Sequence, residues 1–281
     1  MSTDSPQIYK SNALIEASYR LSVAEQRIML ACIAQVRRDE PITDAVLYSV
    51  SAQQIAEMSG TSPKQAYREL QEAALRLKRR EVRLTQEPNG QGSKRKVMVT
   101  GWVQTIFYVE AEGRVELRFT RDMLPYLSEL TEQFTRYALA DVAKMTSAHA
   151  IRLYELLAQW GGIGEREIAI EFLREAMQLG DSYPVFKDLK RRVIEPAVAQ
   201  INDHSPLAVT WEPRKTGRRV THLAFTFGAK KKTAKRAKPR AAVIKPAAAG
   251  ALTDAELRKH ARPGETWEQL RARLNADRAT A

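Results

Sequence analysis

The stretch SAQQIAEMSGTSPKQAYREL, residues 51–70, contains the start and stop signals of two successive helices. Ser51 is a typical N-cap residue for a short first helix, and Gly60 suits the left-handed turn that ends it. Ser62 is placed to cap a longer second helix, whose first position is taken by Pro63. A short helix, a tight turn that contains glycine and a longer helix with a polar face predict a helix-turn-helix.

Strand patterns follow this helix-turn-helix. They occupy EVRLTQEPNGQGSKRKVMVTGWVQTIFYV (residues 81–109) and RVELRFT (residues 114–120). Within the first of these, EPNGQGSKRK (residues 87–96) is rich in turn-forming and basic residues and predicts a connection between two strands. A helix also precedes the motif, because Ser22 and Glu25 form a capping box in front of an apolar pattern. A helix, a helix-turn-helix and a β-hairpin with a basic wing make up the layout of a winged helix.

The same order of elements recurs further along the chain. SAHAIRLYELLAQWG (residues 147–161) predicts a helix, IAIEFLREAMQLG (168–180) predicts a short helix, and LAVTWEPRKTGRRVTHLAFTF (207–227) predicts two strands joined by a basic turn. A basic helix is predicted between the second and the third of these segments, with Pro184 at its first position. Three pairs of landmarks lie 120, 121 and 125 residues apart: Gly60 and Gly180, Pro63 and Pro184, and Glu87–Pro88 and Glu212–Pro213. A nearly constant offset indicates a duplicated winged-helix unit.

The sequence therefore predicts an α+β fold with two tandem winged-helix domains. We place the first domain at residues 11–130, the second at 131–229, a basic linker at 230–250 and a short helical tail at 251–281. The linker is expected to be disordered, because residues 230–245 hold eight cations, no anion and no apolar period.

The overall charge indicates an acidic partner. The chain has a formal net charge of +12 and a pI near 9.8, a balance most often found in nucleic-acid-binding proteins. No apolar run approaches the roughly 20 residues of a membrane span, and the first residues lack the layout of a signal peptide. A cytoplasmic protein without a membrane partner is expected. Cys32, the single cysteine, is expected to be a small buried apolar residue.

The basic helix of the second unit, FKDLKRRVIEPAVAQIN (residues 186–202), has four cations in its first half. On a helical wheel of about 100° per residue, the apolar face is predicted to comprise Val185, Phe186, Leu189 and Val193. Lys190 lies at the edge of this face, where its long stem can cover apolar surface. Pro196 is predicted to kink the helix, so that both halves keep an apolar face toward one core.

The placement of the cations predicts contact with DNA. An α-helix fits the major groove, where Lys and Arg donate to O6 and N7 of guanine, and the wing of a winged helix reaches a nearby phosphate or the minor groove. For the second unit we predict contacts from Lys187, Lys190, Arg191 and Arg192 on the helix and Arg214, Lys215, Arg218 and Arg219 on the wing. For the first unit we predict contacts from Ser62, Lys64, Gln65 and Arg68. Gln65 is also expected to complete a capping box with Ser62.

Two features of the first unit have more than one interpretation. Near the end of its longer helix lie Arg76, Lys78, Arg79 and Arg80, which either contact DNA or simply complement the helix dipole. QTIFYVEAEGRVELRFT (residues 104–120) is a candidate edge for contact with another protein chain.

No catalytic motif is found, and a protein without enzymatic activity, metal or cofactor is expected. NGQGSKRK (residues 89–96) does not match the phosphate-binding pattern GxxxxGK[ST], and the four histidines lack a paired metal spacing. Three functions stay open on these residues alone: a winged-helix transcriptional repressor, a relaxase-like nicking enzyme, and a scaffold that meets only acidic proteins.

Four segments resemble the iteron-binding plasmid replication initiators, a family that includes the initiator of the F plasmid. They are SNALIEASYRLSVAEQRIML (11–30), RLYELLAQWG (152–161), FKDLKRRVIEPAVAQIN (186–202) and VTWEPRKTGRRVTHLAFTF (209–227). The resemblance implies two winged-helix domains that bind direct repeats, called iterons, at a plasmid origin. The C-terminal domain would read most bases, a role that falls here on Lys187, Lys190, Arg191 and Arg192. The N-terminal domain would make auxiliary DNA contacts and mediate dimerisation.

The resemblance also implies partners. Monomers of this family melt the origin and recruit host replication proteins, including the initiator DnaA and the replicative helicase. Homodimers, in equilibrium with monomers, repress the promoter of the initiator's own gene or couple origins, and so limit copy number. Pro196 and the long basic tail are not shared by all members.

Overall fold

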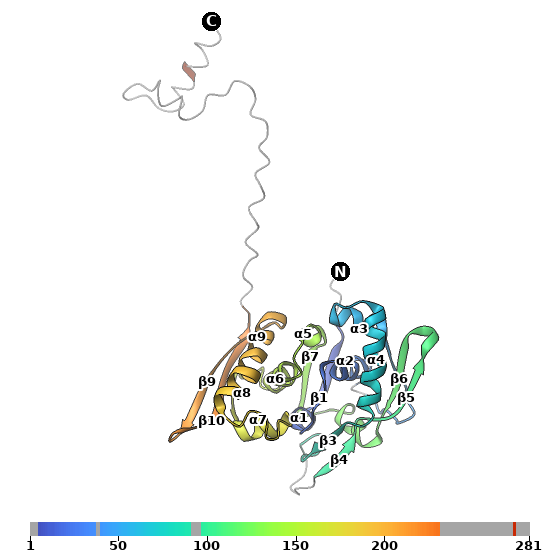
Figure 1. Cartoon of the computed structure of the whole chain (residues 1–281), viewed down its shortest axis with the longest axis horizontal. Helices are drawn as coiled ribbons and strands as arrows, with labels where there is room; N and C mark the ends of the chain where they lie inside the picture. The colour runs from blue at the N-terminus through green and yellow to red at the C-terminus, as the bar shows by residue number, and fades with distance from the viewer. Residues whose placement is uncertain (1–4, 38–39, 91–96, 231–271, 274–281) are drawn as a thin grey trace. The chain divides into compact units, whose positions relative to one another are not determined.

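Residues 5–37, 40–90, 97–230 and 272–273 are described in the computed structural model (Figure 1). Residues up to Lys230 belong to one compact unit. The predicted linker beyond Lys230, and the predicted tail apart from residues 272–273, lie outside the described residues.

The first winged helix has the predicted elements. Helix α2 is followed by a helix-turn-helix, α3 and α4, and by two hairpins, β3–β4 and β5–β6; strand β2 joins the second hairpin in the order β2-β6-β5. Their bounds are α2 Val23–Ile33, β2 Tyr48–Ser51, α3 Ala52–Ser59, α4 Pro63–Leu77, β3 Glu81–Leu84, β4 Met98–Gly101, β5 Val103–Val109 and β6 Arg114–Phe119. The 3₁₀ turns η1 (Glu110–Glu112) and η2 (Arg121–Tyr126) follow β5 and β6.

In the first unit the predicted helix caps are confirmed with one exception. Ser51 caps α3, and Gly60 ends α3 in the left-handed region with φ 72°. Ser62 caps α4, accepting a hydrogen bond from the Gln65 backbone N–H at 3.3 Å. The second hydrogen bond predicted for this capping box, between the Gln65 side chain and the Ser62 backbone, is wrong. The Gln65 side chain donates instead to Glu69 Oε1 at 3.1 Å. A partner one helical turn ahead competes here with the reach back to the cap.

The second winged helix also follows the predicted order, with a third strand, β8, paired to β10. The bounds are α5 Ala140–Ala143, α6 Ala148–Ala158, β8 Glu165–Ala169, α7 Ile170–Ala176, α8 Phe186–Leu189, the π-helical turn η3 Lys190–Ile194, α9 Glu195–His204, β9 Leu207–Thr216 and β10 Arg219–Ala229. Leu223, Phe225 and Phe227 alternate along β10 and are all buried, which confirms the strand pattern.

The start of the basic helix differs from the prediction. Pro184 was expected at the first helical position, but Val185 is the N-cap, with extended backbone angles, and α8 begins at Phe186. Val185 is 58% exposed, so it does not belong to the apolar face. The preceding turn fixes this start, because the Arg174 guanidinium holds the carbonyls of Gly180 and Tyr183 and keeps the chain out of the helix until residue 185.

The change in helix geometry near Pro196 also takes an unpredicted form. A π-helical turn precedes the proline, and Pro196 is the second residue of α9, which continues the same helix without interruption. The proline removes one N–H donor from this continuous helix.

The segments before and between the two helix-turn-helix motifs are tied together. Strand β1 (Gln7–Ser11) pairs antiparallel with β7 (Phe134–Ala138), and α1 (Asn12–Glu16) follows β1 directly. The domain boundary at residue 130 stays a prediction.

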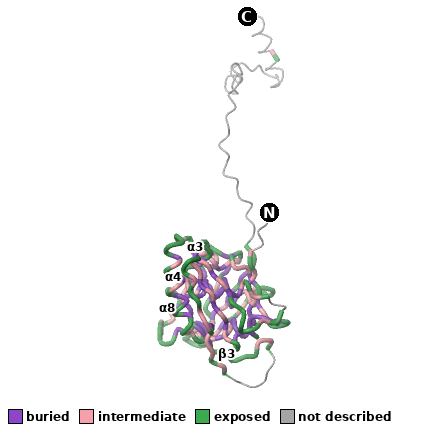
Figure 2. The backbone as a smooth tube through the Cα atoms, turned by 90° about the vertical axis from the view of Figure 1, so that its right-hand side faces the viewer, coloured by how far each residue is buried: buried purple, intermediate pink, exposed green. Residues whose placement is uncertain are grey.

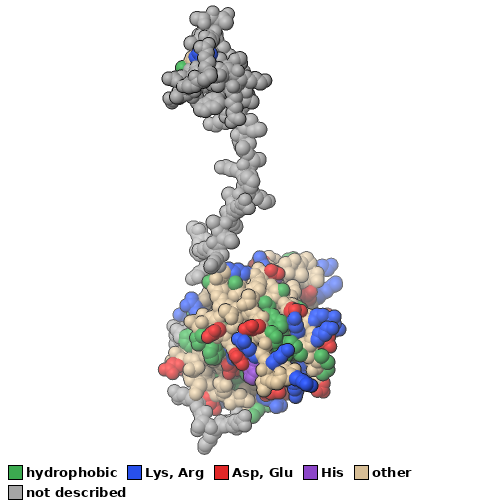
Figure 3. All heavy atoms as spheres, turned by 90° about the vertical axis from the view of Figure 1, so that its left-hand side faces the viewer, with side chains coloured by type: hydrophobic (Ala, Val, Ile, Leu, Met, Phe, Trp, Pro, Cys, Tyr) green, Lys and Arg blue, Asp and Glu red, His purple; other side chains and the backbone are tan. Residues whose placement is uncertain are grey.

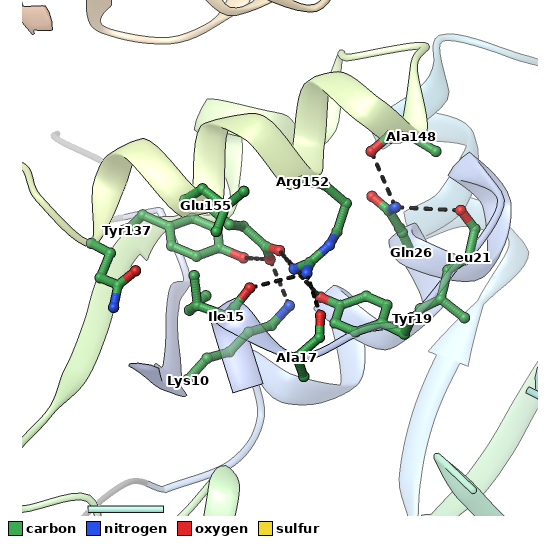
Figure 4. Close-up of polar contacts among 12 residues, drawn as sticks. Lys10, Ile15, Ala17, Tyr19, Leu21, Gln26, Tyr137, Ala148, Arg152 and Glu155 are labelled. Carbon is green, nitrogen blue, oxygen red and sulfur yellow. Dashed lines mark hydrogen bonds and ion pairs between the residues drawn. The ribbon is translucent and has the colours of Figure 1, made fainter. Parts of the chain in front are cut away.

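A buried ionic cluster reinforces this joint (Figure 4). The Glu155 carboxylate accepts hydrogen bonds from Lys10 Nζ at 2.6 Å, Tyr137 Oη at 2.6 Å and Arg152 Nη1 at 2.9 Å. Burial alone would raise the pKa of Glu155, but the charges of Lys10 and Arg152 outweigh it and bring the pKa to about 2. The carboxylate therefore stays ionised inside the core.

Buried residues of both winged helices form one hydrophobic cluster, and Figure 2 shows the buried stretches of the backbone. Cys32 lies within it and is fully buried, as predicted. Within the described residues, no helix is both long and apolar enough to cross a membrane.

Candidate nucleic-acid interface

The second helix-turn-helix is built around a tightly held turn. Between α7 and α8 the backbone takes positive φ angles at Gln178 (47°), Gly180 (52°) and Tyr183 (56°). Arg174 Nη1 donates to the Tyr183 carbonyl at 3.0 Å, and its Nη2 donates to the carbonyls of Gly180 at 2.6 Å and Ser182 at 2.8 Å. A non-glycine residue in the left-handed region is strained, so these bonds hold a turn that would otherwise relax. This turn therefore fixes the residue at which the basic helix begins.

All four cations predicted on this helix are exposed. The Arg191 guanidinium lies 3.5 Å from Asp188 one turn earlier. The Lys190 ammonium lies 3.5 Å from Glu195 and 5.9 Å from the ring centroid of Trp211 on β9. No ion pair is recorded for Lys187 or Arg192 within the described part of the chain. These side chains present donors outward, as a base-reading helix requires.

The wing is the β9–β10 hairpin, closed by a two-residue turn in which Gly217 has φ 61°. Arg214 pairs with Glu212 at 2.8 Å, and no ion pair of Lys215, Arg218 or Arg219 is recorded among the described residues. The wing tip and the start of α8 line one groove of about 700 Å³, which brings Arg218 and Arg219 opposite Pro184 and Phe186. Two cations of the wing tip therefore line the same hollow as the start of the basic helix.

Figure 3, which views the molecule from the side of β9 and β10, shows how Lys and Arg side chains are distributed over this face. Lys and Arg side chains gather most densely toward the right of the folded body in this view. A concentrated basic surface attracts the phosphate backbone of nucleic acid over several ångströms.

In the first unit, Ser62, Lys64, Gln65 and Arg68 are exposed in the first two turns of α4. Ser62 and Gln65 also serve the helix itself, through the cap and through the bond to Glu69. Lys64 and Arg68 have no recorded ion pair in the described residues, so their charges are open to an acidic partner.

Three cations at the end of α4, Arg76, Lys78 and Arg80, bind groups within the protein. Glu25, fully buried at the start of α2, lies 3.4 Å from Arg76 Nε and 3.1 Å from Arg80 Nε. Lys78 Nζ donates to the carbonyls of Val103, at 3.3 Å, and of Gln104. These bonds fasten the end of α4 to α2 and β5, which favours the structural interpretation of this cluster over DNA contact.

The two basic helices face the same side of the protein. In Figure 2, α3, α4 and α8 lie along one edge of the folded body, whereas in Figure 1 α4 and α8 are well separated across it. The two basic helices therefore lie on one side of the folded body, and contact of each predicted residue with DNA stays a prediction.

The described residues contain no close group of three His, Cys, Asp or Glu side chains that could hold a metal ion. Sequence reasoning missed Arg174 and Glu25 as residues that position the two helices. Glu25 had a signal in its capping box with Ser22, but its bonds to Arg76 and Arg80 join residues at least 51 positions apart, which no local pattern shows.

Comparison with known proteins also finds two winged-helix regions in the chain. Residues 7–158 match the family described as "Initiator Replication protein, WH1", and residues 169–227 match "Initiator Rep protein, WH2". The chain is 26% identical over 225 residues to an Escherichia coli "Replication initiation protein", covering 78% of this chain and 68% of that protein. It is 23% identical over 250 residues to the Escherichia coli "PI protein", covering 79% and 82%.

A solved structure is also similar. The crystal structure of Pi initiator protein in complex with iteron DNA superposes with a TM-score of 0.68 at 22% identity, covering 82% of this chain and 99% of that one. This likeness shows that the two proteins share a fold.

Proposed function

Because this chain belongs to the family of initiator replication proteins with two winged-helix regions, we propose that it initiates plasmid replication by binding direct repeats in double-stranded origin DNA. The observation that carries the proposal is the pair of basic helices, α4 and α8 to α9, exposed on one side of one compact body. Relatives named "PI protein" and "Replication initiation protein", and the iteron complex of Pi initiator, support it.

In this mechanism the two helices read successive major grooves on one face of the duplex, about 34 Å apart. Lys187, Lys190, Arg191 and Arg192 donate to guanine edges, which gives sequence preference. Arg214, Lys215, Arg218 and Arg219 of the wing neutralise phosphates, which adds affinity without sequence preference. Binding energy at several repeats then opens the neighbouring duplex, with no catalytic step by this chain.

The test begins with a pool of random duplexes, from which the protein enriches its preferred sequence. Arg191→Ala should cost about 1–3 kcal/mol on that sequence and relax the preference at one base pair. The matched control is Arg37→Ala, because the Arg37 side chain is 71% exposed, compared with 63% for Arg191, and lies outside both helices and the wing. Equal weakening on every sequence would show that Arg191 does not read bases.

Initiation is distinguished from transcriptional repression by origin opening. The purified protein should make a supercoiled plasmid with the enriched repeats sensitive to a single-strand probe, whereas a repressor would only occupy them. Strand cleavage in the presence of Mg²⁺ or Mn²⁺ would instead identify a nicking enzyme.

We further propose that the protein is cytoplasmic, forms homodimers that occupy its own promoter, and acts with DnaA and the replicative helicase as a monomer. Strand β5 supports the homodimer, because it lies at the edge of its sheet and exposes Phe107 (43%) and Tyr108 (41%). Phe107→Glu should shift sedimentation toward the monomer without weakening binding to one repeat. DnaA and helicase binding would be measured by pull-down with the monomeric variant.

A further inference from the structure

The helix that presents the predicted base-reading residues contains a π-helical turn, η3. The Glu195 N–H donates to the carbonyl of Lys190, five residues back, instead of four as in an α-helix. The backbone angles at Leu189 (φ −55°, ψ −49°) and Lys190 (φ −54°, ψ −58°) are ordinary helical values. The turn therefore holds one extra residue, and the helix continues into it with helical backbone angles.

The spacing of the apolar residues explains the turn. Leu189, Val193, Ala197 and Ile201 follow one another at intervals of four and are at most 1% exposed. In a straight α-helix at about 100° per residue, Leu189 and Ile201 would point about 120° apart. One extra residue within the turn reduces this difference to about 20°. The π-helical turn thus lets both ends of the helix face the same core.

The same turn decides where Lys190 points. Lys190 lies seven residues before Ala197, which is fully buried. In a straight α-helix the two would lie only about 20° apart, so the lysine would face the core and Leu189 would be turned out. With the extra residue, Lys190 lies about 120° from Ala197 and its side chain is 46% exposed. The π-helical turn exchanges the two residues between core and surface.

Two neighbours then hold the Lys190 ammonium. Trp211 of β9 offers its ring at 5.9 Å and Glu195 offers a carboxylate oxygen at 3.5 Å. Lysine has a flexible four-carbon stem, so without such neighbours its ammonium group would sample many positions. An aromatic ring and a carboxylate on two different elements restrict it to a narrow range.

We propose that the π-helical turn, Trp211 and Glu195 together position Lys190 as a fixed donor that determines preference at one base pair. Glu195 and Trp211 are positioning residues, since they act through Lys190. The negative charge of Glu195 repels phosphate, so it lowers affinity for DNA in general while it sharpens preference. The inference rests on the DNA reading proposed above.

The first experiment uses the duplex that the wild-type protein enriches from a random pool, and a scrambled duplex of the same composition. Lys190→Ala identifies the base pair concerned. Trp211→Leu and Glu195→Gln should reduce the preference at that base pair, and at no other, by about twofold to fivefold. Trp211→Phe should restore most of it, because the ring remains. Glu195→Gln should also bind the scrambled duplex more tightly than the wild type does.

The second experiment moves the lysine. In L189K/K190L/P196A, leucine occupies position 190, which faces the core in a straight α-helix, and lysine occupies position 189. The P196A substitution removes the proline that interrupts such a helix. This variant should melt close to the temperature of P196A alone, yet lose the base-pair preference as Lys190→Ala does, whereas P196A should keep it. Unfolding of the triple variant, or an unchanged preference in it, would overturn the role of the π-helical turn. Absence of any preference in the wild type would instead refute the proposed function.

Discussion

Replacing Glu155 with glutamine removes a buried carboxylate that holds two cations at the joint between the segments around β1 and helix α6. Glu155 is 1% exposed, and both Lys10 and Arg152 are 3% exposed. Arg152 keeps acceptors in the carbonyls of Ile15 and Ala17, at 3.0 and 2.9 Å. Within the described residues, Glu155 is the one recorded partner of the Lys10 ammonium. Glutamine therefore leaves that ammonium buried without a counter-charge.

The expected loss of folding free energy is about 3–5 kcal/mol, the range for a buried ion pair that loses one partner. For a folded body of this size it corresponds to a fall of roughly 10 °C in the unfolding midpoint. Lys10→Met in addition to Glu155→Gln should recover part of the loss, because it removes the unpaired charge.

The assay is urea unfolding followed by circular dichroism at pH 7. Glu165→Gln serves as the matched control, since Glu165 is exposed and has no recorded ion pair in the described part of the chain; it should change the free energy of unfolding by less than about 0.5 kcal/mol. A loss at Glu155 as small as in this control, or strict additivity of the Lys10 and Glu155 changes, would refute the reasoning.

Three further predictions concern pH, the anchoring of α4 and the linker. The folded pKa of Glu155, about 2, lies below its ordinary value of 4.5, so its contribution to stability is present above about pH 5 and is lost as the pH falls toward 2; acid titration of the unfolding midpoint should show this loss in the wild type and much less of it in Glu155→Gln. Glu25→Gln should lower the free energy of unfolding by about 1–3 kcal/mol in a urea titration, because Arg76 and Arg80 lose their shared carboxylate, whereas Arg79→Ala should have little effect. Deletion of residues 231–245 should weaken binding to every duplex and flatten its salt dependence, and an unchanged slope would show that this segment does not touch DNA.

Much of the fold follows from local signals. The caps at Ser22, Ser51 and Ser62 and the left-handed turn at Gly60 each depend on residues within one helical turn. The alternation of Leu223, Phe225 and Phe227 likewise predicts a half-buried strand without knowledge of its partners. For this reason the order of elements in both winged helices could be predicted.

The candidate site could be predicted only as a set of cations. Spacing placed Lys187, Arg191 and the wing arginines on solvent-facing positions, where the structure has them. It could not distinguish Arg68, which lacks a recorded ion pair in the described residues, from Arg76, which is held by Glu25. Charge alone does not reveal whether a cation already has a counter-charge from elsewhere in the chain.

The sequence by itself determined that this protein has two helix-turn-helix units with basic helices and wings, because caps, turns and periodicity act between residues close together in the chain. Only the tertiary structure decided how those helices are presented. Lys10 and Glu155 meet across 145 residues, Glu25 reaches the far end of α4, and the core selects the π-helical turn that brings Leu189 in and turns Lys190 out. Each of these depends on which groups, distant in sequence, lie together in the low-dielectric interior. An unpaired charge in that interior, or an apolar side chain left on the surface, costs more free energy than a local change of helix geometry.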